Sequence, residues 1–104
     1  MDAGAQHTPL VAALRRSILE APGLTDVPTR QRAFDGAAGE SSALEQYLEM
    51  VRERSAYITD RSVDELRAQG VAEDALFELT VAAAAGAAFH RLEAGLRAMR
   101  SGDA

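Results

Sequence analysis

The residues with the clearest chemical potential are a histidine and an acid near the C-terminus. Glu93 lies three positions after His90, and Arg97 lies seven positions after it. On a helix these spacings bring all three side chains to one side. A histidine beside a carboxylate suits general acid or base chemistry in a cleft between subunits. Ordinary helix-surface clusters and interface hydrogen bonds have the same spacing, and the sequence favours that simpler interpretation.

Glu78 is the third candidate catalytic residue. Helical spacing places it on the flank of an apolar face that includes Phe89 and Leu96. A buried carboxylate has a raised pKa unless it is paired, and such groups are enriched at functional sites. The favoured alternative is a structural ion pair with an arginine. The candidate partners are Arg15, Arg16 and Arg54.

Several kinds of chemistry are excluded by what the chain lacks. It has no cysteine, which rules out disulfides, thiolate metal sites and thiol redox catalysis. The two histidines, His7 and His90, are more than eighty residues apart, so a metal site would have to be built almost entirely from carboxylates. No glycine-rich phosphate loop or nucleophilic serine motif is present. We therefore predict neither a metal nor a cofactor.

The charge balance and hydropathy limit the partners. Sixteen acidic residues outnumber eleven basic ones and give a net charge of −5, which disfavours nucleic acid and anionic membranes as partners. The longest uncharged stretch, residues 79–90, is too short to cross a bilayer, and the chain does not open with a basic region and an apolar run. We expect a cytoplasmic protein.

Capping and proline signals divide the chain into helices, and no segment has the pattern of a strand. Residues 1–8 are predicted to be a flexible tail, 9–101 a single all-helical domain and 102–104 a C-terminal tail. Thr8 followed by Pro9 predicts a first helix that ends near Glu20. Pro28 predicts a short second helix that ends near Gly36, and residues 37–41 are a predicted linker.

Two further helices precede the last one. Ser42 and Glu45 match a capping box, which predicts a helix that reaches about Tyr57. Either Thr59 or Ser62 is predicted to cap a fourth, short helix. Gly70, which follows it, is predicted to end this helix in a left-handed conformation. With the long C-terminal helix, the fold class is all-α, a small domain of four to five helices.

The stretch 71–100 predicts one alanine-rich helix of about 30 residues, roughly 45 Å long. A compact domain of this length is only about 35 Å across. The helix has two apolar faces. The bulkier face contains Phe77, Val81, Ala88, Leu92, Leu96 and Met99. The face of smaller residues contains Leu76, Leu79, Ala83, Ala87 and Ala94.

The two faces predict two different partners. We expect the bulkier face to pack on the chain's own core and the face of smaller residues to pack on another subunit, because residues 81–89 allow a second helix backbone to approach closely. Bulky replacements of Ala83 or Ala87 should then disrupt assembly more than helix content. The alternative is that the face of smaller residues lies against the chain's own short helices or faces water.

The run 57–84 resembles the carboxymuconolactone decarboxylase and alkylhydroperoxidase D-like superfamily. There a short helix of the form V-x-x-L-x-x-x-G leads into a helix that opens with acidic residues and continues I/L-F/V-E-L-x-x-x-A-A. The resemblance covers roughly residues 44–99. The matching positions are Val63, Leu66, Gly70, Glu73, Asp74, Leu76, Phe77 and Glu78.

The resemblance implies an alkylhydroperoxidase D-like helical unit and a homo-oligomer, a dimer, trimer or hexamer, formed through the helices. Redox-active members use a Cys-x-x-Cys pair with a histidine and a glutamate as proton relays. Because this chain has no cysteine, nothing of that motif carries over, and thiol peroxidase activity is excluded.

Three functions stay open at this point. The leading one is a non-redox member of this superfamily that acts as a self-associating helical protein. The second is a small-molecule enzyme, of decarboxylase or isomerase type, whose His90 or Glu78 handles a small organic acid or lactone at the subunit interface. The third is an adaptor that presents the long helix to a different protein.

Overall fold

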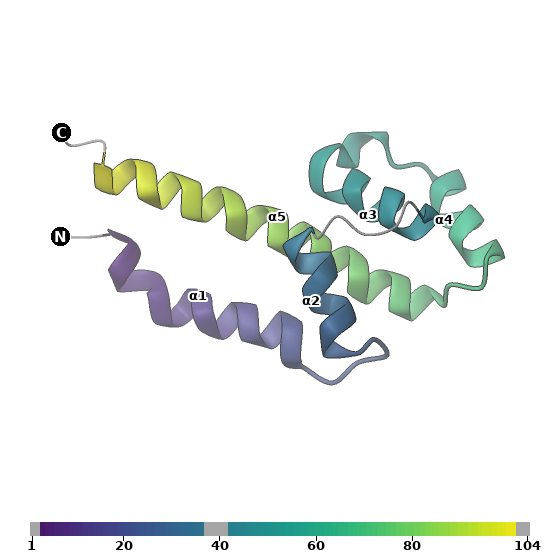
Figure 1. The fold of residues 1–104 in the computed structure, drawn as a ribbon, viewed down its shortest axis with the longest axis horizontal. Helices are drawn as coiled ribbons and strands as arrows, with labels where there is room; N and C mark the ends of the chain where they lie inside the picture. Colours follow the sequence, from purple (N-terminus) through teal and green to yellow (C-terminus); the bar gives the residue numbers. More distant parts are fainter. Residues whose placement is uncertain (1–2, 37–41, 102–104) are drawn as a thin grey trace.

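Five α-helices make up the described chain, and the longest of them forms its axis (Figure 1). The computed structural model describes residues 3–36 and 42–101. These residues contain no strand, so the predicted all-α class is confirmed for them. The elements are α1 (Ala3–Glu20), α2 (Val27–Asp35), α3 (Ala43–Glu53), the short 3-10 helix η1 (Ser55–Tyr57), α4 (Asp60–Ala68) and α5 (Glu73–Ser101).

The first helix begins earlier than its proline signal predicts. Helix α1 starts at Ala3, so Pro9 lies inside the helix and not in its first turn. Two alanines and a glutamine precede the proline and favour helix, while the proline costs the helix one backbone hydrogen bond. The predicted tail is therefore helical from residue 3 onward. Residues 1–2, the predicted linker at 37–41 and the predicted tail at 102–104 lie outside the described residues.

Side-chain oxygens cap the starts of α2 and α3. The Asp26 carboxylate accepts a hydrogen bond from the backbone N–H of Thr29 at 2.8 Å. The Ser42 hydroxyl accepts one from the backbone N–H of Glu45 at 3.1 Å, as the sequence predicts. Each cap satisfies a backbone donor that has no partner within its helix.

The segment between α3 and α5 follows the predicted order with one shorter helix. Helix α3 ends at Glu53, earlier than the predicted end near Tyr57, and η1 takes up the remainder. Thr59, one of the two predicted caps, opens α4 in a capping box with Ser62. Gly70 has a φ of 93°, the left-handed conformation predicted for it, which glycine adopts without steric cost.

Helices α1, α2 and α3 all pack against α5. Helix α5 runs unbroken for 29 residues, which confirms the long C-terminal helix. Tyr47, Leu48 and Val51 form the buried side of α3, as their spacing predicts. The buried apolar residues form one cluster: Leu19, Ala33, Phe34, Tyr47, Leu48, Val51, Leu66, Leu76, Leu79, Ala82, Ala83 and Phe89.

The predicted roles of the two α5 faces are reversed in the structure. Leu76, Leu79 and Ala83, from the face of smaller residues, are buried inside this chain. On the bulkier face, Phe77 has a relative exposure of 68%, and Leu92 is also exposed. The expectation that the bulkier face packs on the core is therefore wrong. The alternative, in which this face lies against the chain's own short helices, is correct for Leu76, Leu79 and Ala83, whereas Ala94 is exposed.

Close contact between α2 and α5 explains this reversal. A Cβ atom on Gly86 would overlap the backbone carbonyl of Phe34 in α2. One turn earlier, Ala82 and Ala83 have relative exposures of 0%. Small side chains thus let two helix backbones touch and fill the space at close-packed density. The helix predicted to come from another subunit is α2 of the same chain, so Ala83 belongs to the monomer core.

Three arginines bind carbonyl oxygens at the C-terminal ends of helices. Arg30 donates to the Ala21 carbonyl just after α1 at 2.6 Å, and Arg52 donates to the Ala33 carbonyl in α2 at 3.2 Å. Arg91 donates to the carbonyl of Arg52 in α3 at 2.9 Å. Carbonyls at helix ends lack partners within the helix and carry partial negative charge. These cations therefore fasten α1, α2 and α3 to their neighbours.

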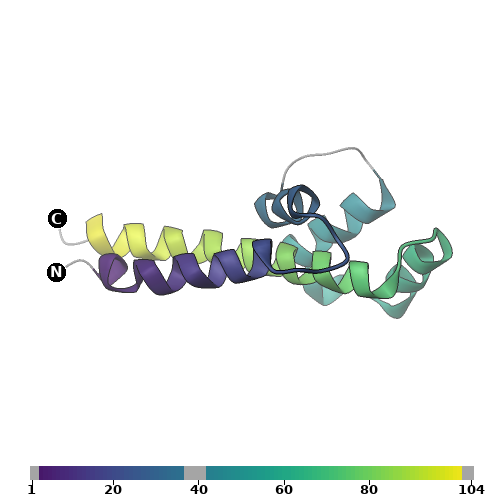
Figure 2. The same cartoon turned by 90° about the horizontal axis from the view of Figure 1, so that it is seen from below.

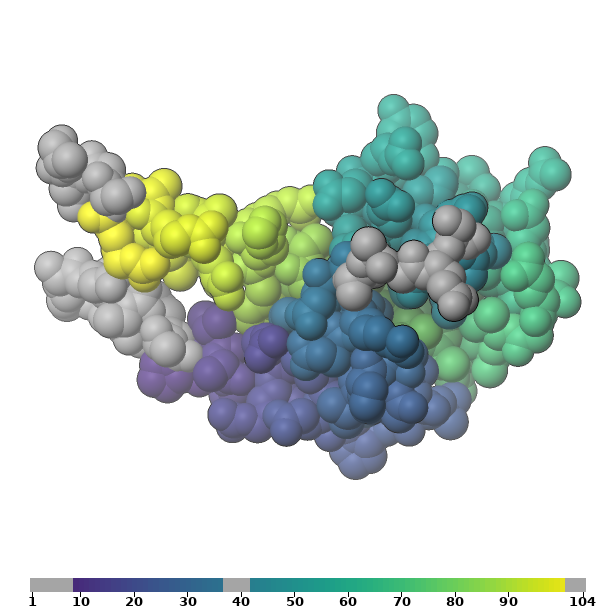
Figure 3. Space-filling model, in the orientation of Figure 1, coloured from purple at the N-terminus to yellow at the C-terminus, as the bar shows by residue number. Residues whose placement is uncertain are grey.

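The molecule is long for its chain length. It measures 52 × 29 × 22 Å with a radius of gyration of 15.7 Å, compared with about 13 Å for a compact domain of this size. Helix α1 and the C-terminal half of α5 run antiparallel and extend together away from the other helices (Figure 2). The space-filling view in Figure 3 shows α1 along the lower edge and the C-terminal part of α5 at the upper left of this elongated body. This elongated part leaves much helix surface uncovered.

Candidate functional site

A cleft of about 600 Å³ lies where α1, α2, α3 and α5 meet. His90 and Glu93, two of the three residues predicted from the sequence, line it from α5. The charged or titratable lining residues are Arg15, Asp35, Arg52, Glu53, His90 and Glu93. Arg97, the third member of the predicted helical cluster, is not among the lining residues. The structure thus brings a histidine, two arginines and three carboxylates around one space.

A tilted pair of aromatic rings forms part of the apolar lining of this cleft. The ring centroids of Phe34 and Phe89 are 5.5 Å apart, with the planes tilted by 46°. The Arg15 guanidinium lies 5.1 Å from the Phe34 centroid, within the range of a cation–π contact. Arg52 is held in place by its hydrogen bond to the Ala33 carbonyl. Fixed cations beside aromatic surface suit a small organic anion.

The chemistry available in the cleft is acid–base chemistry and anion binding. His90 and Glu93 are exposed to solvent in the single chain, so neither is set apart by burial. Arginines 15 and 52 supply the positive charge that a carboxylate or enolate oxygen requires.

The sequence missed most of the residues that complete the cleft. Arg15, Asp35, Arg52 and Glu53 come from three helices that are far apart in the chain. No spacing rule links them, because only the tertiary packing brings these helices together. The helix C-termini are the one available signal, since Asp35 and Glu53 are the last residues of α2 and α3.

Glu78 lies outside this cleft and performs a structural task. Its carboxylate accepts hydrogen bonds from the backbone N–H of Leu24 at 2.7 Å, and from the backbone N–H and hydroxyl of Thr25 at 3.3 and 3.1 Å. These contacts fasten the loop between α1 and α2 to α5. A Cβ atom on Gly23 would meet the same carboxylate, so the loop passes close to the end of the Glu78 side chain.

The predicted ion pair of Glu78 is replaced by these loop contacts. No ion pair with an arginine is formed by Glu78 among the interactions of the described residues. The hydrogen bond from Leu24, with those from Thr25, lowers the pKa of Glu78 from its ordinary value of 4.5 despite partial desolvation. A raised pKa, which the catalytic hypothesis requires, is thus the opposite of what the structure gives.

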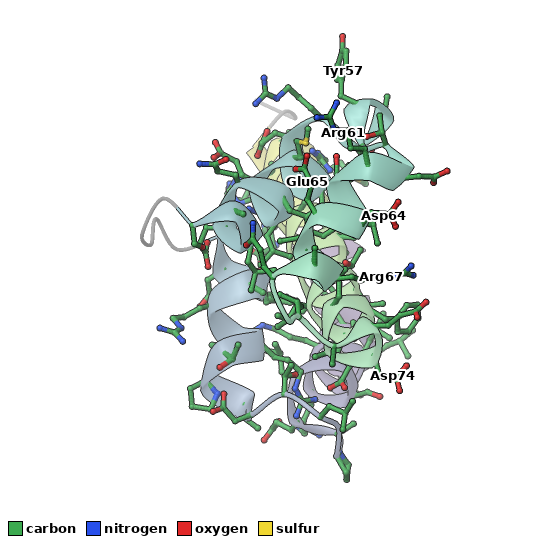
Figure 4. The ribbon with its side chains drawn as sticks, turned by 90° about the vertical axis from the view of Figure 1, so that its right-hand side faces the viewer. Tyr57, Arg61, Asp64, Glu65, Arg67 and Asp74 are labelled. Atoms are coloured by element: carbon green, nitrogen blue, oxygen red, sulfur yellow. The ribbon has the colours of Figure 1, made fainter. Side chains whose placement is uncertain are left out.

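The opposite end of the molecule carries charged residues along α4. Figure 4 shows Tyr57 pointing away from the body, with Arg61, Asp64, Glu65 and Arg67 distributed along α4. Arg67 contacts the carboxylate of Asp64 at 3.6 Å, and Arg61 contacts that of Glu65 at 3.2 Å. Ion pairs this exposed contribute little to stability. They make a solvated surface.

The described residues hold neither a candidate metal cluster nor a candidate membrane span. Residues 3–36 and 42–101 contain no group of three or more histidine, cysteine, aspartate or glutamate residues placed to hold a metal ion. None of the described helices combines the length and the hydropathy that a membrane span requires.

Comparisons with known proteins identify no relative of this chain. No protein-family model matches the chain, and neither the curated proteins nor the solved structures contain a significant match. The functional argument therefore depends on the cleft and the surfaces of this molecule alone.

Proposed function

We propose that the protein is a self-associating helical protein, a non-redox member of the carboxymuconolactone decarboxylase-like superfamily, which assembles through its C-terminal helix. The observation that carries self-association is the outward-facing bulky side of α5. Phe77, Leu92 and Met99 are exposed there, and the described residues provide no helix that covers them.

Other exposed apolar residues support the same proposal. Leu10 and Leu14 on α1, Leu24 in the loop that follows it, and Val27 at the start of α2 are also exposed. Large apolar side chains gathered on a small protein mark interaction surfaces. A domain of about 100 residues also buries a smaller fraction of its surface than a larger one, so an oligomer gives this elongated chain the burial that it lacks.

The family part of the proposal is supported by the order of three local features. A capped α4 is followed by Gly70 and then by a helix that opens with Glu73 and Asp74 and continues into alanines. This is the order that the resemblance expects. A test is whether the assembled form has the alkylhydroperoxidase D-like arrangement of helices when its structure is solved.

Light scattering coupled to size-exclusion chromatography tests self-association directly. At micromolar concentration we expect a mass that is a multiple of the 11.1 kDa chain. Leu92→Glu, on the exposed face of α5, should shift the mass toward that of one chain, whereas Ala94→Glu, elsewhere on the same helix, should not. A single-chain mass for the unaltered protein would contradict the proposal and favour an adaptor whose partner is a different protein.

A second candidate function is acid–base catalysis on a small organic acid or lactone, with His90 and Glu93 in the cleft. The observation in its favour is that His90, Arg15 and Arg52 together line one cleft of about 600 Å³. Titration with benzoate and with a simple γ-lactone, followed by amide NMR, should perturb residues 34–36 and 90–93 if the cleft binds such molecules. Unchanged spectra at millimolar ligand would reject it.

A further inference from the structure

We propose that two copies of this chain pair through α5 in antiparallel orientation, with Ala88 at the twofold axis. This inference rests on the proposed self-association and specifies its geometry. The surface involved, named the outer stripe, consists of Phe77, Val81, Ala84, Ala88, Leu92, Gly95 and Met99. All seven residues are exposed in the single chain.

The spacing of the outer stripe keeps it straight along the helix. Its members follow one another at steps of four, three, four, four, three and four residues. This is an eleven-residue periodicity of about 3.67 residues per turn, close to the 3.6 of an undistorted helix. The stripe therefore runs about 33 Å along one side of α5 without a charged residue. A partner helix is able to follow it over its whole length.

Side-chain sizes in the outer stripe are complementary when two copies of the stripe pack in antiparallel orientation. With Ala88 facing Ala88 of the second copy, Ala84 lies level with Leu92 and Val81 with Gly95. Leu92 and Val81 then each face a small residue, and the two central alanines allow the helices to approach to the short end of the usual 8–10 Å separation. A parallel pairing in register would instead place Leu92 against Leu92 and leave a gap at Gly95.

In this pairing Phe77 lies level with Met99 of the second copy. A recess lies next to Phe77, and the Met99 side chain of the second copy enters it. Ile18 of α1 and Ala21 just after it, together with Phe77 and Val81, line an open pocket of about 330 Å³. Methionine is flexible and polarizable, fills irregular gaps and makes favourable contacts with aromatic rings. The recess at one end of the stripe thus fits the side chain at the other end.

Charge favours the same orientation. The first turn of α5 carries Glu73 and Asp74, and its last turn carries Arg100. Antiparallel pairing places these acids near Arg100 of the second copy and opposes the two helix dipoles favourably. Parallel pairing would set acids beside acids and arginines beside arginines. Size and charge, which are independent properties of the sequence, thus select one arrangement.

Single-cysteine cross-linking is a clean test, because the chain has no cysteine of its own. A disulfide needs Cα atoms within about 7 Å. Ala88→Cys should form a covalent dimer on mild oxidation, resolved on a non-reducing gel. Val81→Cys and Gly95→Cys should each fail alone, since position 81 lies about 21 Å from its own copy. Mixed in equal amounts, these two variants should cross-link to each other.

The matched control is Ala94→Cys, an exposed alanine outside the stripe on the same helix, which should not cross-link. Cross-linking of Val81→Cys with itself would overturn the antiparallel arrangement. A light-scattering mass of an oligomer without the Ala88 cross-link would also overturn it, while leaving self-association intact. A single-chain mass in light scattering would remove self-association and this pairing together.

Discussion

The two sides of helix α5 differ in a way that reverses the usual expectation for a helix in a small protein. The inner side has the small residues Ala82, Ala83 and Gly86 at its centre, and these are buried together with Leu76, Leu79 and Phe89. The outer stripe carries Phe77 and Met99, and it is exposed. Bulk is therefore a poor guide to which side of this helix faces the core.

Contact distance explains the difference. On the inner side, the absent side chain at Gly86 makes room for the Phe34 carbonyl of α2, so the backbones themselves supply the contacts. On the outer stripe, large side chains project into space that no described helix of the same chain occupies. Small residues allow a rigid neighbouring helix to approach closely. Large exposed apolar residues mark a surface to which a partner binds.

The strongest test of this contrast compares two glycines of α5. Gly86→Ala adds a methyl group against the α2 backbone and should lower the free energy of unfolding by about 3 kcal/mol. Gly95→Ala meets no atom within 4 Å in the single chain, so it should raise that energy by up to about 1 kcal/mol through helix propensity. Urea unfolding at dilute concentration measures both. Equal effects would mean that α2 does not contact α5 as described.

Arg30 tests the hydrogen bonds that hold the C-terminal end of α1 against α2. Its relative exposure is 6%, and its Nη1 donates to the Ala21 and Ile18 carbonyls, while its Nε has no partner. Arg30→Met removes the hydrogen bonds and keeps much of the bulk, so we expect a loss of about 2 kcal/mol. Chemical unfolding with Arg32→Met, at an exposed position of α2, as control measures this. Equal small losses would show that the buried cation adds nothing.

Glu78 connects the inner packing to pH. Because its pKa in the folded protein lies below the ordinary value of 4.5, its contribution to stability is fully present above that pH. It is lost as the pH falls through the lower native pKa. Glu78→Gln should therefore be less stable than the unaltered protein at neutral pH and should lose less stability between pH 5 and 3. Thermal unfolding at a series of pH values measures this, and parallel pH profiles would contradict it.

The outer stripe should show the smallest effect on monomer stability and a clear effect on assembly. Phe77→Glu replaces a side chain with 68% relative exposure, so the free energy of unfolding should change by no more than about 0.5 kcal/mol in dilute solution. In the same variant, light scattering should detect loss of the oligomer. Strong unfolding of the monomer would show that Phe77 supports the core and would remove the contrast between the two sides.

Local signals predicted most of the helical framework. The hydroxyl caps at Ser42 and Thr59, the left-handed Gly70 and the unbroken α5 are all found where the sequence indicates. The start of α1 and the end of α3 differ. Proline is common in a first turn, which predicts a start at Pro9, yet α1 begins at Ala3.

The candidate site was predicted only where it lies on one helix. His90 and Glu93 share the cleft because a spacing of three residues places them on one side of α5. The cations Arg15 and Arg52 come from α1 and α3 and have no sequence relation to them. The interactions of Glu78 were also missed, since its partners in the loop at residues 24–25 lie more than fifty positions away.

By itself, the sequence determined most of the helix boundaries and which chemistry is excluded. Caps, glycine stops and alanine-rich runs act through hydrogen bonds within about four residues, and the lack of any cysteine is a property of the composition. Only the tertiary structure decided which side of α5 turns inward and which residues share a cleft. Those outcomes depend on how closely another backbone approaches α5. That distance is set at Gly86, where α5 meets α2 from a distant part of the chain.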